Sequence, residues 1–198
     1  MAQGPRSQLP GLQRRHDQEP LLPPGRLDTP LGSGHRRRGL RRETAVTDDR
    51  EPTIRPATEA DLPEIVAMLA DDPLGATRES PDDLTPYAEA FRRLATDPHQ
   101  HVMVAVRGER VVGTLQLTII AGLSRRGATR SVIEGVRVHA EERGSGLGTR
   151  FIEWAVEHSR RENCVLVQLT SDVTRTDAHR FYERLGFTAS HVGFKRAL

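Results

Sequence analysis

The sequence has one cysteine, Cys164, and no apolar run long enough to cross a membrane. A single thiol cannot form a disulfide within the chain. A membrane-spanning helix needs about 20 consecutive apolar residues, and the arginine-rich N-terminal residues lack the apolar segment of a secretory signal. We therefore expect a cytoplasmic protein with no membrane partner, in which Cys164 is a reduced structural thiol in a buried strand.

Metal-ligand spacing is also missing from the sequence. The histidines, the acidic residues and the one cysteine do not fall at the intervals of known zinc sites. We therefore expect no metal cofactor. An arrangement of serine, histidine and aspartate for nucleophilic catalysis is not supported either.

Charge and composition divide the chain near residue 50. Residues 1–42 hold nine arginines and three acids, a net charge of +6, whereas the remainder holds 20 basic and 24 acidic residues. Residues 1–50 carry six of the 13 prolines and almost no apolar periodicity. Such a segment cannot bury enough apolar surface to offset its ordering entropy. We predict a disordered extension at 1–50 and one folded domain at 51–198.

The arginine run at 35–42 raises the alternative of a nucleic-acid-binding tail. No aromatic residue is interleaved to stack on bases, so nucleic acid is not the expected partner. Binding through this tail would weaken steeply with salt and would disappear when residues 1–45 are removed.

Apolar periodicity predicts an α/β domain with the order β-α-α-β-β-β-α-β-α-β. Strands are expected where apolar residues alternate or run continuously, and helices where they recur every three to four residues. We expect helices to begin near residues 59, 84, 147 and 177, and residues 121–130 to form a loop. The expected strands are 53–56, 102–106, 111–120, 132–138, a fully buried strand at 164–169, and a closing strand at 187–194.

A glycine-rich turn, Arg143-Gly144-Ser145-Gly146-Leu147-Gly148, follows the strand at 132–138 and opens a helix. Glycines let the backbone approach an anion, and the N–H groups of a helix start point toward it, which suits a pyrophosphate. Two common pyrophosphate motifs fit poorly. The lysine of a P-loop is missing after Gly148, and a dinucleotide fingerprint needs a third glycine where Thr149 stands.

The remaining pattern, Arg-x-x-Gly-x-Gly, resembles the acetyl-CoA-binding motif of the GNAT N-acetyltransferase superfamily. Residues 177–187, Asp-Ala-His-Arg-Phe-Tyr-Glu-Arg-Leu-Gly-Phe, resemble the C-terminal helix of that family. The two motifs stand in the family's order, and the resemblance covers roughly 53–198. It implies the GNAT fold, a mixed and mostly antiparallel sheet flanked by helices, and acetyl-CoA as the co-substrate.

The resemblance also implies the residues that bind the coenzyme. In the family the fourth strand splays from the fifth, so the backbone of Val136, Arg137 and Val138 would hydrogen-bond the pantetheine arm and polarise the acetyl carbonyl. The turn would hold the pyrophosphate through backbone N–H groups, with Arg143 adding charge. Arg150 is either a phosphate contact or a solvated side chain. The residues of the turn are Arg143, Gly144, Ser145, Gly146, Leu147, Gly148 and Thr149.

Tyr182 and Glu134 are the candidate catalytic residues. Matching family members use this tyrosine as the general acid toward the coenzyme A thiolate, and a phenol with its ordinary pKa of about 10 is protonated at neutral pH. A purely structural role in the core is the alternative. Some members carry a glutamate base at position 134. Strict alternation would place Glu134 on one face with Val132, Val136 and Val138, whereas a bulge would redirect it.

The C-terminal part of the chain, from Arg175 onward, is similar to that of bacterial aminoalkylphosphonate N-acetyltransferases. The similarity makes a phosphonate acceptor a lead and not an assignment. The basic loop residues Arg125, Arg126 and Arg130 could hold an anionic acceptor group or be solvated. Arg175 stands where the family often has an asparagine that contacts the pantetheine region, so that contact is not carried over.

The sequence therefore predicts an N-acetyltransferase that moves an acetyl group directly from acetyl-CoA to a primary amine of a small molecule. Direct transfer is expected because Cys164, in a core strand, is a poor acyl carrier. The alternatives are a non-catalytic acyl-CoA sensor and a protein acetyltransferase that acts on lysine or N-terminal amines. A homodimer is left open.

Overall fold

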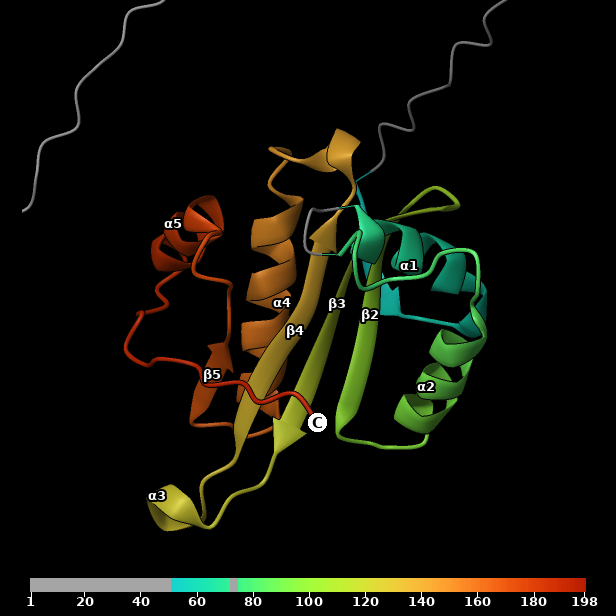
Figure 1. The fold of residues 1–198 in the computed structure, drawn as a ribbon. Helices are drawn as coiled ribbons and strands as arrows, with labels where there is room; N and C mark the ends of the chain where they lie inside the picture. Colours follow the sequence, from blue (N-terminus) through green and yellow to red (C-terminus); the bar gives the residue numbers. More distant parts are fainter. Residues whose placement is uncertain (1–50, 72–74) are drawn as a thin grey trace, which may run out of the picture. The chain divides into compact units, whose positions relative to one another are not determined.

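The structure is a computed structural model that describes residues 51–71 and 75–198, so the extension predicted at 1–50 lies outside the described residues. The described part contains a five-stranded sheet in the order β1-β2-β3-β4-β5 (Figure 1). Pairing is antiparallel from β1 to β4 and parallel between β4 and β5, which confirms the mixed, mostly antiparallel sheet. The strands are β1 (Thr53–Pro56), β2 (Gln100–Arg107), β3 (Arg110–Ile120), β4 (Arg130–Val138) and β5 (Leu166–Leu169).

Helices cover both faces of this sheet (Figure 1). α1 and α2 pack against one face, and α4 packs against β3, β4 and β5 on the other. The helices are α1 (Leu62–Ala70), α2 (Thr85–Ala95), α3 (Ser124–Gly127), α4 (Leu147–Arg161) and α5 (Thr176–Arg184), with 3-10 turns η1 (Glu59–Asp61) and η2 (Ala140–Glu142).

Alternation along β2 separates the core into two layers. Met103 belongs to a buried cluster with Phe151 of α4, whereas its neighbour Val104 packs with Ile65 of α1. Successive side chains of a strand point to opposite faces, so β2 contributes to both layers. This explains why its interior is an almost continuous apolar run, buried from Met103 to Val106.

A bulge interrupts β4 at Gly135. Glu134 pairs with Gln116 and Arg137 pairs with Thr114, so two residues of β4 stand opposite one residue of β3. Gly135 has a φ of +59°, a left-handed conformation that costs a residue with a side chain about 1–2 kcal/mol. The glycine therefore makes the bulge possible at this position.

The bulge corrects the predicted orientation of Glu134. Val136 and Val138 pack against the same buried cluster as Ile133, on the α4 face, whereas the Glu134 side chain is exposed. Of the two arrangements that the sequence left open, strict alternation is therefore wrong, and the bulge separates Glu134 from the face of Val136 and Val138. One extra residue in the strand reverses the alternation that the expectation assumed.

The closing strand expected at 187–194 is also wrong. The structure assigns no strand to residues 187–198, and Val192 and Phe194 are 79% and 93% exposed. These two residues have the spacing of one strand face, but within the described residues no strand of the sheet pairs with this segment, so that face is not covered. Within the described residues, β5 pairs with β4 alone.

Two smaller expectations also differ from the structure. The strand expected at 164–169 is shorter, Leu166–Leu169, and it is half-buried and not fully buried. The loop expected at 121–130 contains α3, a single turn in which Arg125 and Arg126 adopt left-handed φ values of +54° and +63°. β5 is an edge strand of the sheet, where fewer neighbours cover it, whereas α3 lies in the connection between the interior strands β3 and β4.

Candidate active site

The glycine-rich turn leads directly into the N-terminus of α4. Gly144 and Gly146 both have a φ of +86°, and the helix begins at Leu147. The first N–H groups of any helix lack intrahelical partners, here including those of Gly148 and Thr149. The 15-residue helix adds the positive end of its dipole. The turn therefore has the backbone conformation that an anion site at a helix N-terminus requires.

Ion pairs hold this turn on both sides. Arg107 donates to Glu142 from Nε to Oε1 at 2.7 Å and from Nη2 to Oε2 at 2.9 Å, and these bonds are the main cause of the lowered pKa of Glu142. Arg143 donates from Nη2 to Oδ2 of Asp71 at 2.8 Å, and both side chains are about half exposed. A phosphate group at the turn would compete with Asp71 for Arg143.

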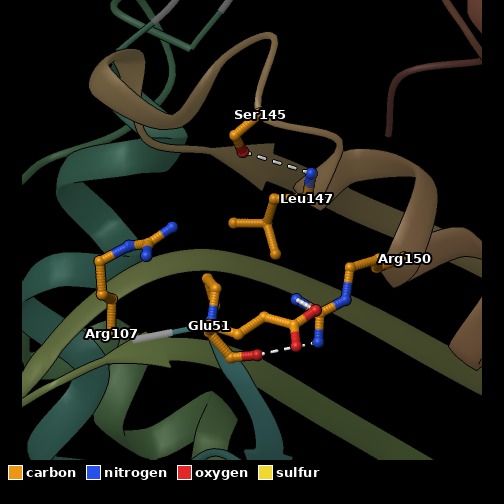
Figure 2. A pocket seen from close by; sticks show the side chains of 6 residues that line it. Glu51, Arg107, Ser145, Leu147 and Arg150 are labelled. Atoms are coloured by element: carbon orange, nitrogen blue, oxygen red, sulfur yellow. Dashed lines mark hydrogen bonds and ion pairs between the residues drawn. The ribbon is translucent and has the colours of Figure 1, made fainter. Parts of the chain in front are cut away.

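A pocket lies beside the turn, and Figure 2 shows Arg150 pointing toward Glu51 within it. Nη1 of Arg150 lies 2.8 Å from Oε1 of Glu51, and Nη2 donates to the carbonyl oxygen of Pro52 at 3.0 Å. Arg150, for which the sequence left a phosphate contact and a solvated side chain as alternatives, is 39% exposed and pairs with Glu51. Its guanidinium ties α4 to the residues that precede β1. The pocket is lined by Glu51, Pro52, Arg107, Ser145, Leu147 and Arg150.

A second cavity opens where β4 and β5 separate. The two strands pair only from Arg130–Leu166 to Ile133–Leu169, so the rest of β4 has no partner on the β5 side. This arrangement is the splay that the GNAT resemblance implied. The cavity, called here the splay cavity, is lined by Ile133, Glu134, Gly135, Val136, Arg137, Leu169, Thr170, Ser171, Arg175 and Tyr182.

Tyr182 lies on α5 and faces the splay cavity with part of its surface. Its ring packs edge-to-face against the rings of Phe181 and Phe187. The distances between ring centroids are 5.2 Å to Phe181 and 5.9 Å to Phe187. Burial raises the pKa of the phenol, and the charges of Arg175 and Arg137 oppose that rise. The phenol is therefore protonated at neutral pH and can serve as a proton donor. The structural role and the proton-donor role are compatible.

Glu134 also lines this cavity, from β4 immediately before the bulge. Its side chain is exposed. Arg137 lines the same cavity and donates from Nη1 to the carbonyl oxygen of Val136 at 2.9 Å. The structure thus brings Glu134, Val136, Arg137 and Tyr182 together. Val138 instead packs into the core beside α4.

Three polar residues that line the cavity were not predicted as site residues. Thr170 and Ser171 directly follow β5, and Arg175 precedes α5. The Oγ atom of Ser171 is buried and has no hydrogen-bond partner within residues 51–71 and 75–198. A usable signal existed in the sequence, because polar residues that follow a strand lie at its carboxyl edge, where sites form in open sheets.

Cys164 lies outside the splay cavity. Cys164 is half-buried just before β5, burial is the main cause of its raised pKa, and its backbone N–H donates to the Ser159 carbonyl at 2.9 Å. Within the described ranges, no group of three or more His, Cys, Asp or Glu side chains could hold a metal ion. In the same ranges no helix is long and apolar enough to span a membrane.

Comparison with known proteins decides the family. The model of the GNAT acetyltransferase family matches residues 62–187. The chain belongs to this family. A curated GNAT relative, the aminoalkylphosphonate N-acetyltransferase of Salmonella typhimurium, is 30% identical over 73% of this chain and 90% of the relative.

Solved structures agree with the GNAT fold. A protein described as a transcriptional regulator from Bacillus halodurans is 45% identical, with a TM-score of 0.73 over 75% of this chain and all of that chain. Glucosamine-6-phosphate N-acetyltransferase from Arabidopsis thaliana has a TM-score of 0.63 over 75% of this chain and 99% of its own, at 18% identity. The second likeness is one of fold alone.

Proposed function

We propose that this GNAT protein transfers the acetyl group of acetyl-CoA directly to a primary amine of a small molecule. The observation that carries the proposal is the splay cavity, where Glu134 and Tyr182 line one space beside unpaired β4 backbone. The glycine-rich turn at the start of α4 would hold the pyrophosphate, with Arg143 released from Asp71 to pair with it.

The chain's residues would move two protons during the transfer. Glu134, through water, accepts a proton from the attacking amine, so that the nitrogen lone pair can form the new N–C bond. The β4 backbone at Val136 polarises the acetyl carbonyl. Tyr182 donates its phenol proton to the thiolate sulfur as the C–S bond breaks. Cys164 takes no part, because its raised pKa makes it a poor nucleophile.

The relative from Salmonella typhimurium supports a small amine as the acceptor, since its name describes an aminoalkylphosphonate. We therefore take aminoalkylphosphonates as the first acceptors to test. A protein amine remains a competing acceptor class.

The test measures coenzyme A thiol release from acetyl-CoA with a panel of small primary amines, aminoalkylphosphonates and a lysine peptide. We expect release with a small amine and a loss of roughly 100-fold or more in kcat for Tyr182→Phe. The matched control is Tyr87→Phe, because Tyr87 is the other tyrosine of the chain and lies on α2, with its hydroxyl bonded to Glu79 and Ser80.

Native activity with an unchanged kcat in Tyr182→Phe would remove the proton-donor role. Release with the peptide alone would replace the small acceptor by a protein. A second candidate function is a non-catalytic acyl-CoA sensor, favoured by the description of the Bacillus halodurans protein as a transcriptional regulator. Binding of acetyl-CoA without thiol release for any amine would favour that candidate.

A further inference from the structure

Gln116 stands directly opposite Glu134 on the neighbouring strand β3. Side chains directly opposite one another in an antiparallel pair lie on the same face, with Cβ atoms about 4.5–5.5 Å apart. The adjacent pair, Leu117 and Ile133, belongs to the buried cluster beneath α4. Gln116 and Glu134 therefore share the other face of the sheet, and their polar ends lie within reach of one water molecule.

Two neighbouring side chains hold the Gln116 amide in one orientation. Nε2 of Gln116 donates to Oε1 of Gln100 at 2.9 Å, and the Thr118 hydroxyl donates to the same oxygen at 2.9 Å. All three side chains are half-buried. Because nitrogen and oxygen diverge from the amide carbon of Gln116, its Oε1 atom is directed away from Gln100 and from strand β2.

The outward oxygens of this pair lack donors within the protein. Among residues 51–71 and 75–198, no side chain or backbone N–H donates to Oε1 of Gln116 or to the Glu134 carboxylate. A half-buried acceptor gains stability when a ligand or a water molecule donates to it. Two such acceptors, on adjacent strands of one face, form a site for a single molecule with two donor hydrogens.

A water molecule at this position would be fully oriented. Its two hydrogens would be donated to the Glu134 carboxylate and to Oε1 of Gln116, which leaves an oxygen lone pair for the N–H of the acceptor amine. The proton that leaves the amine nitrogen passes to the water oxygen while one proton of the water passes to the carboxylate. The nitrogen keeps the electron pair that forms the new N–C bond.

We propose that Gln116 positions the water through which Glu134 takes the proton of the acceptor amine. Gln116 acts through this water and not on the thioester, so it is a positioning residue. Its bond to Gln100 fixes the amide in advance, which reduces the ordering cost when the amine binds. This inference rests on the proposed function, because it uses the base that the proposed function assigns to Glu134.

The direct test is a crystal structure of the full-length protein with coenzyme A bound, for the native chain and for Gln116→Met. Methionine approximates the shape of glutamine but accepts hydrogen bonds only weakly. In the native chain we expect an ordered water within about 3 Å of both the Glu134 carboxylate and Oε1 of Gln116. The variant should lack this water. No acceptor amine is needed for this measurement.

Thiol release gives a second readout, with the small amine that the native protein acetylates fastest. Gln116→Met should lower kcat by about 10-fold or more at pH 7 and leave KM for acetyl-CoA unchanged. The loss should shrink toward about pH 10, where an alkyl ammonium group releases its proton without assistance. Gln168→Met is the matched control, because Gln168 is exposed on β5, and it should match the native enzyme.

A native crystal without this water would overturn the inference, and so would a Gln116→Met variant with the native kcat at every pH. A loss of kcat that is equal at every pH would also contradict it, because Gln116 would then support only the sheet. Absence of thiol release with every amine would refute the proposed function instead. The crystal would still decide whether Gln116 and Glu134 hold a water together.

Discussion

Replacing Asp61 with asparagine tests how the chain positions α1 beside the sheet. The Asp61 side chain is only 8% exposed and accepts hydrogen bonds from Nη1 and Nη2 of Arg55 at 2.7 and 2.8 Å. It also accepts from the backbone N–H of Thr58 at 2.7 Å and from the Thr58 hydroxyl at 3.0 Å. These four contacts join β1, the turn η1 and the start of α1 through one carboxylate.

The size of the effect follows from the pKa of Asp61, which falls from its ordinary 3.8 to about 2, with the hydrogen bond from Arg55 as the largest cause. At about 1.4 kcal/mol per unit, the carboxylate stabilises the fold by about 2 kcal/mol relative to its neutral form. Asparagine cannot carry the charge, so Asp61→Asn should lower the free energy of unfolding by about 2 kcal/mol. For a domain of this size the melting temperature should fall by roughly 4–8 °C.

Urea unfolding at pH 7 and as a function of pH checks this reasoning. The folded pKa of Asp61 is lowered, so its contribution is complete above about pH 3.8 and is lost as the pH falls toward about 2. Asp61→Asn should lose that part of the acid dependence. Asp82→Asn, in an exposed loop, is the control. A variant within 0.5 kcal/mol of native, with the same acid dependence, would refute the assignment.

Two further changes test the bulge and a pair of histidines. Gly135→Ala should lower the free energy of unfolding by about 1 kcal/mol, since its Cβ meets no atom within 4 Å but its φ of +59° strains an alanine. Gly193→Ala, equally open and without a positive φ, is the control, and equal melting temperatures would contradict the strain. The pKa of His101 is lowered by burial and, to a smaller extent, by the charge of His158. The Nε2 atoms of the two rings are 3.3 Å apart. The contribution of neutral His101 to stability should therefore be complete above about pH 6.5 and be lost as the pH falls below that value. The check is the free energy of unfolding measured from pH 7.5 to 5.5 for the native protein and for His101→Gln. Equal slopes for the two proteins would contradict the prediction.

The sequence was sufficient for the features that depend on local pattern. Apolar periodicity located every strand from β1 to β5 and the four longer helices, because each buries one face or stripe. The glycine-rich turn was also predictable from local sequence, since the left-handed conformations at positions 144 and 146 favour glycine. Element ends shifted by a few residues, as at β5, where tertiary neighbours decide where pairing stops.

The sequence was insufficient where a position depends on distant contacts. Alternation alone does not reveal a bulge, so the sequence left the face of Glu134 open between strict alternation and a bulge. Arginine is a residue type that often binds phosphate, but the Arg150 side chain is directed by its ion pair with Glu51, which lies almost 100 positions earlier in the sequence. The apolar Val192 and Phe194 suggested a strand, yet a strand forms only where a neighbouring edge and a covered face are both present.

The bulge also explains how the splay cavity acquires its charged groups. Glu134 and Arg137 are three residues apart, so an uninterrupted strand would place them on opposite faces. Because Gly135 and Val136 together stand opposite one residue of β3, both side chains line the same cavity while Val136 turns into the core. β5 stops pairing with β4 at Ile133, just before this point, which leaves the β4 backbone available on that side. One inserted residue, tolerated because it is glycine, therefore accounts for the way in which Glu134 and Arg137 line the same cavity.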